Sequence, residues 1–201
     1  PGPSAHTGAW TVRELEGDRS TGRSPGGSDS SGEGVRTVRV GIGFDMHAFG
    51  LGEHVTLGGV EIPFEQGVVA HSDGDVLIHA LCDALLGAMG LGDIGEHFPD
   101  SDPRWYGADS RLFLRHCNGL IRTHGWRLVN ADVTVVAEAP KLGPYRAQMK
   151  TNLGADLEVP ADRINIKATT CERLGAVGRS EGLACHAIVL LAYAHGNQHG
   201  N

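Results

Sequence analysis

The stretch from Arg39 to His47 constrains the fold most, because β-branched Val40 and Ile42 alternate there with glycines. This alternation predicts a buried strand that runs into a loop. Asp45 and His47 lie two residues apart, and residues so spaced project to the same face of an extended strand. One carboxylate and one imidazole are therefore directed to a common point. They form a pair of zinc-type ligands that lacks a third member.

The candidate for the third ligand comes from the next strongly patterned segment, residues 71–86. Apolar side chains recur there with helical spacing. Ser72 is followed three residues later by Asp75, which resembles a capping box. We therefore expect a helix that begins near Asp73 and ends near Gly90.

His79 lies on a polar stripe of this helix, with Asp75 four residues before it and Asp83 four residues after it. One explanation of the stripe is a solvated helix face. The other is a metal ligand, because a metal-bound imidazole usually donates its remaining N–H to a carboxylate. Asp45, His47 and His79 would leave the fourth position of a tetrahedral zinc ion open, which is the pattern of a catalytic site.

A second group of residues, the phosphate cluster, consists of Lys141 and Thr169–Glu172. Hydroxyls, backbone N–H groups at a strand end and an ammonium suit a diphosphate. Glu172 could hold a hard divalent cation that stays partly hydrated and bridges phosphates. The alternative is ordinary turn chemistry beside a surface lysine and glutamate.

Two other motifs carry less chemistry. His71, Ser72 and Asp73 have the residue types of a hydrolase triad, but sequence neighbours cannot easily adopt its relay geometry. Gly41 and Gly43 lack the rest of a dinucleotide-binding fingerprint.

Composition excludes several classes of protein. The chain has 201 residues, 40% of them hydrophobic and 20% charged, an ordinary balance for a globular protein with a real core. The net charge is -7 without a visible basic stripe, so nucleic acid is not an expected partner. No apolar run reaches membrane-spanning length, so no membrane partner is expected. Four dispersed cysteines indicate a reducing compartment, and we expect the cytoplasm, with the plastid stroma as the alternative.

The first 35 residues differ from the rest of the chain. Residues 20–32 are almost all serine, glycine and other polar types, which cannot bury enough apolar surface to offset their ordering entropy. We expect a disordered tail or a linker from an upstream domain at 1–35, in a chain that is processed or part of a longer protein. The acidic residues in it argue against a plastid transit peptide. A second polar tail is expected at 196–201.

Further periodic segments complete the predicted fold. A Gly-Gly pair within residues 55–63 predicts a hairpin. Helices are expected at 109–123 and 144–157, and residues 91–103 are expected to form a loop. Strands are expected at 126–138, 164–168 and 182–193. Because helices and strands are interspersed without strict alternation, we predict an α+β fold with a mixed β-sheet and helices packed on one face.

Several separated motifs together resemble the 2-C-methyl-D-erythritol 2,4-cyclodiphosphate synthase family. They occur in the same order as in that family and cover about Val38 to Ala194. The motifs are Gly43–His47, Ala70–Asp75, His79–Gly87, Leu91–Gly95, Phe98–Asp100, Ala139–Lys141, Lys167–Gly175 and Gly178–Gly182. The resemblance implies a catalytic domain at 36–195 that assembles as a homotrimer, with active sites between subunits.

The resemblance also implies a reaction. A lyase of the non-mevalonate isoprenoid precursor pathway would convert 4-diphosphocytidyl-2-C-methyl-D-erythritol 2-phosphate to 2-C-methyl-D-erythritol 2,4-cyclodiphosphate and release CMP. Asp45, His47 and His79 would bind Zn2+, and Glu172 would bind Mg2+ or Mn2+. His71 and Thr170 match the positions that stabilise the transition state. Independently of the resemblance, the polar stripe of the helix predicts that Asp83 accepts from His79 and orients it. An upstream cytidylyltransferase domain is a further expected partner.

The substrate-binding positions that the resemblance implies fall into two sets. The methylerythritol phosphate would contact Ser72, Asp93, Ile94, Gly95, Phe98, Pro99, Asp100, Ser101 and Asp102. The cytidine diphosphate part of the substrate would be bound by the second set, which consists of Ala137, Glu138, Ala139, Pro140, Lys141, Leu142, Gly143, Ala168, Thr169, Cys171, Ala176 and Arg179.

The chain departs from the family at the cavity that such trimers often carry on the threefold axis for an isoprenoid diphosphate. Phe44 and Arg179 match positions that line this cavity. An aromatic residue seen in relatives is replaced by Ala176, and an acidic residue by His186. We therefore expect looser binding of an isoprenoid tail in this chain.

Two rival functions use the same residues. A zinc-dependent phosphoester hydrolase would use the three zinc-type ligands and release inorganic phosphate. A non-catalytic trimeric protein that binds isoprenoid diphosphates would use the axial cavity alone. The intact phosphate cluster argues against the hydrolase, and the intact set of ligands argues against the binding protein.

Overall fold

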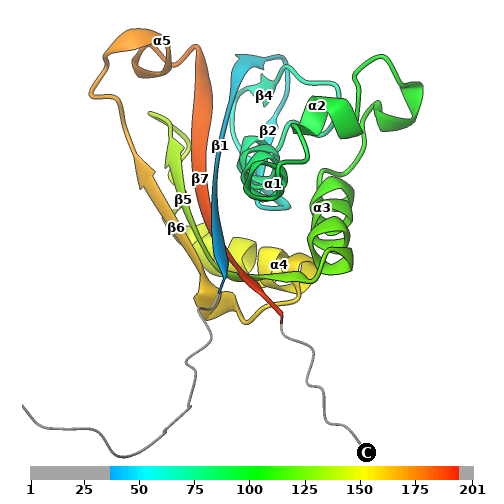
Figure 1. Cartoon of the computed structure of the whole chain (residues 1–201). Coiled ribbons are helices and arrows are strands. Elements are labelled where there is room, and N and C mark those ends of the chain that lie inside the picture. The colour runs from blue at the N-terminus through cyan, green and yellow to red at the C-terminus, as the bar shows by residue number, and fades with distance from the viewer. Residues whose placement is uncertain (1–36, 195–201) are drawn as a thin grey trace, which may run out of the picture. The chain divides into compact units, whose positions relative to one another are not determined.

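The computed structural model describes residues 37–194, and the predicted tails at 1–35 and 196–201 lie outside this range (Figure 1). The strands are β1 Val38–Gly50, β2 His54–Leu57, β3 Val60–Pro63, β4 Gly67–Val68, β5 Trp126–Val136, β6 Ile164–Thr169 and β7 Gly182–Tyr193. The α-helices are α1 Val76–Met89, α2 Ile94–His97, α3 Arg111–Thr123, α4 Arg146–Leu157 and α5 Gly175–Gly178. Short 3-10 turns occur at Pro103–Trp105, Gly143–Tyr145 and Ala161–Arg163.

The sheet is mixed, as the sequence predicts. Its strand order is β4-β1-β7-β5-β6. β5 and β6 pair in parallel, whereas β1 with β4, β1 with β7 and β5 with β7 pair antiparallel. Strands β2 and β3 form a separate hairpin whose turn residues, Gly58 and Gly59, both have positive φ.

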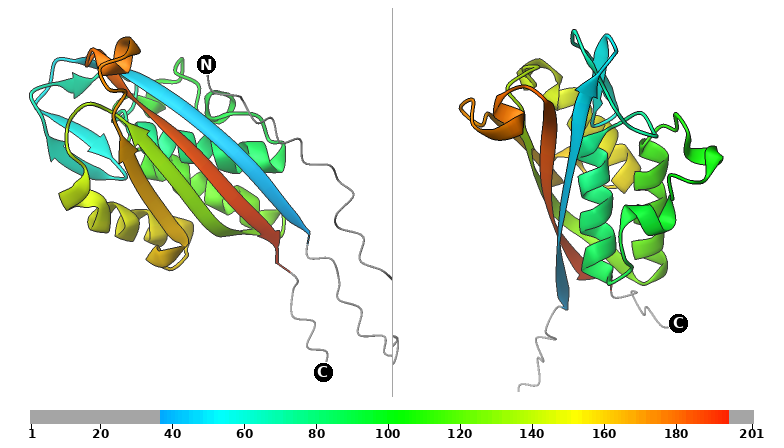
Figure 2. Two further views of the ribbon diagram at one scale, coloured as in Figure 1. Left: turned by 90° about the vertical axis from the view of Figure 1, so that its left-hand side faces the viewer. Right: turned by 90° about the horizontal axis from the view of Figure 1, so that it is seen from above.

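Helices α1, α3 and α4 cover one face of the sheet, and the apolar core lies between them and the strands (Figures 1 and 2). Helix α1 is apolar nearly all round, because it packs on β1 and β7 on one side and on α3 on the other. Helix α3 buries Phe113, Leu114, Cys117 and Ile121, while Leu112 on its other side is 50% exposed. Among residues 37–194, no helix is long and apolar enough to cross a membrane.

The other face of the sheet carries no covering helix in the left view of Figure 2. Large apolar side chains of β1 are exposed there, with Ile42 at 68% and Val40 at 66%. Register places Ile42 beside Ile188 of β7 and Phe44 beside His186. Farther along the sheet, this face becomes polar and carries an ion pair between Lys167 and Asp132.

Several elements differ from the expectation. Strand β1 continues to Gly50 instead of entering a loop near His47, and Val40 and Ile42, expected in a buried strand, are exposed because the glycines between them face α1. Helix α1 begins at Val76 rather than near Asp73, because Gly74 has a left-handed φ of 72° and the Asp75 side chain caps the helix by accepting from Ile78 N. The expected loop after α1 contains the short helix α2, whose cap is Asp93. The helix end at Gly90 agrees with the prediction.

Candidate functional site

Strand β1 presents Asp45 and His47 to the helix-covered side of the sheet. Its buried and exposed residues alternate, with Gly41, Gly43, Asp45 and His47 toward α1. A Cβ atom at Gly43 would overlap the backbone carbonyl oxygen of Ala80. The glycines therefore let the backbone of α1 approach β1 closely enough for side chains of both elements to meet.

Helix α1 contributes His79 from its first turn. The cap residue Asp75 is fully buried, and its carboxylate accepts from Ile78 N at 3.0 Å and from Gly59 N at 2.7 Å. It thereby joins the start of the helix to the β2–β3 hairpin. Burial raises the pKa of Asp75 to about 6, against the opposing effect of the hydrogen bond from Gly59.

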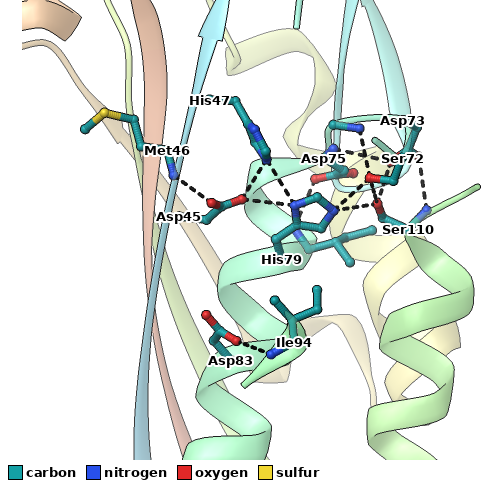
Figure 3. Close-up of polar contacts among 12 residues, drawn as sticks. Asp45, Met46, His47, Ser72, Asp73, Asp75, His79, Asp83, Ile94 and Ser110 are labelled. Carbon is teal, nitrogen blue, oxygen red and sulfur yellow. Dashed lines mark hydrogen bonds and ion pairs between the residues drawn. The ribbon is translucent and has the colours of Figure 1, made fainter. Parts of the chain in front are cut away.

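Three ligand atoms converge between β1 and α1 (Figure 3). His47 Nε2 lies 2.9 Å and His79 Nδ1 lies 3.0 Å from Asp45 Oδ2. The two ring nitrogens are 3.1 Å apart. A tetrahedral zinc ion with ligands at about 2.0–2.1 Å separates them by about 3.3 Å. The three atoms therefore already form nearly the triangle that such an ion needs, and their chemistry fits a divalent metal.

The electrostatics of this triad match a cation site. Burial alone would raise the pKa of Asp45, but hydrogen bonds with His47 and His79 outweigh burial and hold that pKa well below its usual value. The pKa of His47 is raised: burial lowers it, and the hydrogen bond to and charge of Asp45 raise it by more. The carboxylate is thus kept ionised, and a metal ion that binds here would displace the proton that the raised pKa of His47 favours.

The remaining nitrogen of His79 faces serines rather than an acid. His79 Nε2 lies 3.1 Å from Ser72 Oγ and 2.9 Å from Ser110 Oγ. Asp83, which the sequence predicts as the carboxylate that orients His79, instead accepts from Ile94 N at 2.8 Å. Asp83 lies one turn farther along α1 than His79, beside Ile94, and its carboxylate is engaged there (Figure 3).

A cavity of about 650 Å³ opens beside the triad. It is lined by Asp45, His47, Val69, Ala70, His71, Ser72, His79, Ile94, Gly95, Phe98, Asp100, Trp105, Tyr106 and Phe113. Its aromatic wall is well packed, with Phe98 stacked on Phe113 at 4.4 Å between ring centroids. A cavity with an apolar wall and convergent polar groups is typical of a small-molecule site.

Only some of the residues predicted for the methylerythritol pocket and for catalysis line this cavity. His71, Ser72, Ile94, Gly95, Phe98 and Asp100 line it, whereas Asp93, Pro99, Ser101 and Asp102 do not. Asp93 caps α2 by accepting from Glu96 N, and Asp102 forms an ion pair with Arg104. The sequence motifs did not single out Trp105, Tyr106 or Phe113. The helical spacing of Phe113 is the same for a cavity wall as for a core, and Trp105 and Tyr106 lie in a connecting segment without a motif.

The phosphate cluster lies elsewhere on the sheet. Thr170 Oγ1 donates to Glu172 at 2.9 Å, and Glu138 accepts from the N–H of Cys171 at 2.9 Å. Lys141 and Thr169–Glu172 are exposed, except that Cys171 is half-buried. None of them lines the cavity beside the triad. The turn between β6 and α5 projects away from α1 in Figure 1.

The register of the sheet measures the separation. Asp45 pairs with Cys185, Cys185 with Val135, and Val135 with Ala168. Ala168 therefore lies on the same row as Asp45 but three strands away, roughly 14 Å at the usual spacing of strands. One subunit thus holds the triad and the phosphate cluster at two separate places.

Comparison with known proteins gives one consistent result. A family model described as the YgbB family matches residues 38–192. A protein of Azotobacter vinelandii named 2-C-methyl-D-erythritol 2,4-cyclodiphosphate synthase is 57% identical over 154 residues, which is 77% of this chain and 98% of that protein.

Two solved structures share the fold. The bifunctional IspDF of Campylobacter jejuni matches with a TM-score of 0.76 and 45% identity over 79% of this chain, which covers only 43% of that longer protein. IspF of Plasmodium falciparum, solved as a complex with CDP, matches with a TM-score of 0.70 and 33% identity over 80% of this chain and 99% of that one.

Proposed function

The chain belongs to the 2-C-methyl-D-erythritol 2,4-cyclodiphosphate synthase (YgbB) family, and we propose that it carries out that reaction at a site shared between subunits. The substrate is 4-diphosphocytidyl-2-C-methyl-D-erythritol 2-phosphate, and the products are the 2,4-cyclodiphosphate and CMP. The observation that supports it best is the preformed triangle of Asp45, His47 and His79 beside a cavity of substrate size.

The chemistry requires positioning and charge neutralisation. An oxygen of the 2-phosphate forms a bond to the β-phosphorus, and the bond from that phosphorus to the bridging oxygen breaks, so that CMP leaves with the electron pair. Both reacting groups are anionic and repel one another. Phosphoryl transfer of this kind needs in-line alignment and stabilisation of charge rather than a side-chain nucleophile.

The metal sites supply part of that charge. Asp45, His47 and His79 would hold Zn2+, and Glu172 would hold Mg2+ or Mn2+ between the phosphates. When bound, such ions neutralise phosphate oxygens in the transition state. Lys141 adds an ammonium, and His71 and Thr170 would donate hydrogen bonds to the developing charge.

The cavity would bind the methylerythritol part of the substrate. The stacked wall of Phe98 and Phe113 offers apolar surface to its carbon chain, and Ser72 and Asp100 offer polar partners for its hydroxyl groups. Asp83 supports this pocket indirectly, because it fixes the backbone of Ile94.

We place the active site between two subunits because the two halves lie apart in one chain. Groups that neutralise the same phosphoryl group sit within a few ångströms of it, about 4 Å for paired metal ions. Three strand spacings separate Asp45 from Ala168, which is too far. A homotrimer that buries the bare apolar face of β1 would bring the phosphate cluster of one subunit to the triad of its neighbour.

The same arrangement supports an axial anion site. Phe44 lies on the bare face, 4.7 Å from the ring of His186, and Arg179 is exposed beside Glu181. Three copies of Arg179 could hold one diphosphate with their guanidinium groups. Ala176 leaves less apolar wall for an isoprenoid tail.

A product assay tests the proposed function against its rivals. The purified protein is incubated with the diphosphocytidyl substrate, Zn2+ and Mg2+, and CMP and inorganic phosphate are both measured. We expect CMP and the cyclic diphosphate in equal amounts without inorganic phosphate. Inorganic phosphate without CMP would indicate the phosphoester hydrolase, and no turnover with intact metal binding would indicate a binding protein.

A further inference from the structure

His79 has two ring nitrogens with different surroundings. Nδ1 belongs to the metal triangle, where it lies 3.0 Å from Asp45 Oδ2. Nε2 points to the opposite side, between the hydroxyls of Ser72 and Ser110 (Figure 3). A nitrogen that binds a metal ion must keep its lone pair free, so the proton of a metal-bound His79 must lie on Nε2.

The hydrogen bonds of Ser110 dictate that proton position. Ser110 Oγ lies 2.5 Å from Asp73 Oδ1, and Asp73 Oδ2 accepts from Ser110 N at 3.2 Å. An ionised carboxylate only accepts, and a hydroxyl has a single hydrogen to donate. Ser110 therefore donates to Asp73, and its oxygen is left to accept from His79 Nε2–H at 2.9 Å.

Helix capping does not account for this serine. Ser110 stands at the N-cap position of α3, yet its side chain makes no capping hydrogen bond. The residue is fully buried, and its hydroxyl is directed to His79, Ser72 and Asp73. Asp109, not Ser110, accepts from the first N–H of α3, so the Ser110 hydroxyl contacts His79 instead of capping its own helix.

The two serines at His79 are not equivalent. Ser72 lines the cavity, whereas Ser110 does not. Gly74 N donates to Ser72 Oγ at 3.3 Å, and no carboxylate among residues 37–194 takes the hydrogen of Ser72. The nearest protein acceptor for that hydrogen is Ser110 Oγ at 3.3 Å, a long contact that a ligand in the cavity can replace. The hydrogen of Ser110 is committed to Asp73.

We propose that Asp73 and Ser110 are positioning residues of the metal site, which hold His79 in the tautomer whose Nδ1 lone pair faces the metal ion. Asp73 fixes the direction of the Ser110 hydroxyl, and Ser110 fixes the proton on Nε2. This inference rests on the proposed metal site. Partners of this kind raise metal affinity by roughly 10–100-fold.

The test compares Ser110→Ala with Ser72→Ala, which removes a hydroxyl at a similar distance from the same nitrogen. Zinc affinity is measured by competition with a chromophoric chelator, in the full-length chain. We expect Ser110→Ala to lower zinc affinity roughly 10–100-fold and Ser72→Ala to lower it less than about threefold. Asp73→Asn should act in the same direction as Ser110→Ala, because its amide can donate to Ser110 Oγ and turn the hydroxyl hydrogen toward Nε2.

A second measurement keeps the inference testable if Ser110→Ala folds poorly. Nitrogen-15 NMR of the zinc-loaded parent protein should show the His79 proton on Nε2, with a hydrogen-bonded shift that changes in Asp73→Asn and not in Ser72→Ala. Parental zinc affinity in Ser110→Ala, an equal loss in Ser72→Ala, or an unchanged Nε2–H signal in Asp73→Asn would overturn it. Failure of the parent protein to bind zinc would overturn the proposed metal site as well.

Discussion

The metal triad and the phosphate cluster show how differently two halves of a site can be built in one chain. The triad lies between β1, α1 and α3. Hydrogen bonds hold the rings of His47 and His79 in place. The residues of the phosphate cluster follow the ends of β5 and of the edge strand β6, and they are mostly exposed. The first half is preorganised within a subunit, whereas the proposed trimer would supply the second half from a partner surface.

The largest expected effect is at the enclosed half. We predict that His79→Ala loses zinc and activity by at least about a thousandfold, because two protein ligands hold a catalytic zinc ion poorly. Asp83→Asn is the matched control on the same helix. Since Asp83 contacts Ile94 and not His79, this variant should keep its zinc. It should lose activity only because Ile94, which lines the cavity, is held less firmly. Elemental analysis and the CMP assay distinguish the two, and full zinc content in His79→Ala would contradict the assignment.

Mixing two inactive variants tests whether the halves belong to different subunits. His79→Ala keeps the phosphate cluster, and Glu172→Ala keeps the triad. Random mixing of equal amounts in a trimer leaves about a quarter of the interfaces with both halves intact, so about a quarter of the parental activity should return. Each variant alone, denatured and refolded in the same way, is the control. Mixed trimers shown by mass spectrometry that stay inactive would place both halves in one subunit.

The close approach of β1 and α1 should be sensitive to a single methyl group. We predict that Gly43→Ala lowers the free energy of unfolding by about 3 kcal/mol or more, because the new Cβ overlaps the backbone of Ala80. Gly87→Ala is the matched control on α1, where nothing lies closer than 3.9 Å to the new atom. It should raise stability by about 0.5–1 kcal/mol. Denaturant unfolding of metal-free protein measures both, and equal effects would refute the packing argument.

The enclosed half should also depend on pH through Asp75. Its pKa is raised to about 6 from 3.8, so the folded state favours the protonated form. The stability contribution is therefore present below pH 3.8 and is lost as the pH rises through 6, by up to about 3 kcal/mol. Relative to Asp75→Asn, metal-free parent protein should lose stability between pH 4 and pH 7. A constant difference between the two would show that the carboxyl titrates normally.

The smallest expected effect concerns the bare face. Inorganic diphosphate should raise the melting temperature by a few degrees, since an anion bound by three copies of Arg179, each released from its ion pair with Glu181, binds only the assembled trimer. Geranyl and farnesyl diphosphate should add little, because Ala176 provides little wall. Arg179→Ala should abolish the shift, and sulfate at equal ionic strength serves as the control. A large gain with tail length would refute this view of the cavity.

Sequence reasoning succeeded where a pattern has a single physical explanation. Alternation along β1 placed Asp45 and His47 on one face and Phe44 on the other, and the burial pattern confirms it. The start of α1 was predicted too early, because a capping box at Ser72 was favoured over the left-handed Gly74 that prevents it.

The partners of His79 show why the rest was out of reach. Helical spacing places Asp75 and Asp83 on its stripe, and that spacing fixes which residues share a face. It does not fix which of them reach the ring. Asp75 is drawn into the cap and Asp83 to Ile94, while Ser110 arrives from α3.

The sequence by itself determined the family, the ligand types and the alternation of β1, because these follow from residue identity and from periods of two and 3.6 along the chain. Only the tertiary structure decided that α1 lies against Gly41 and Gly43, that Asp73 reaches His79 through Ser110, and that two strands lie between the triad and the phosphate cluster. Those are contacts between segments far apart in the chain, and packing of the whole sheet and its helices sets them.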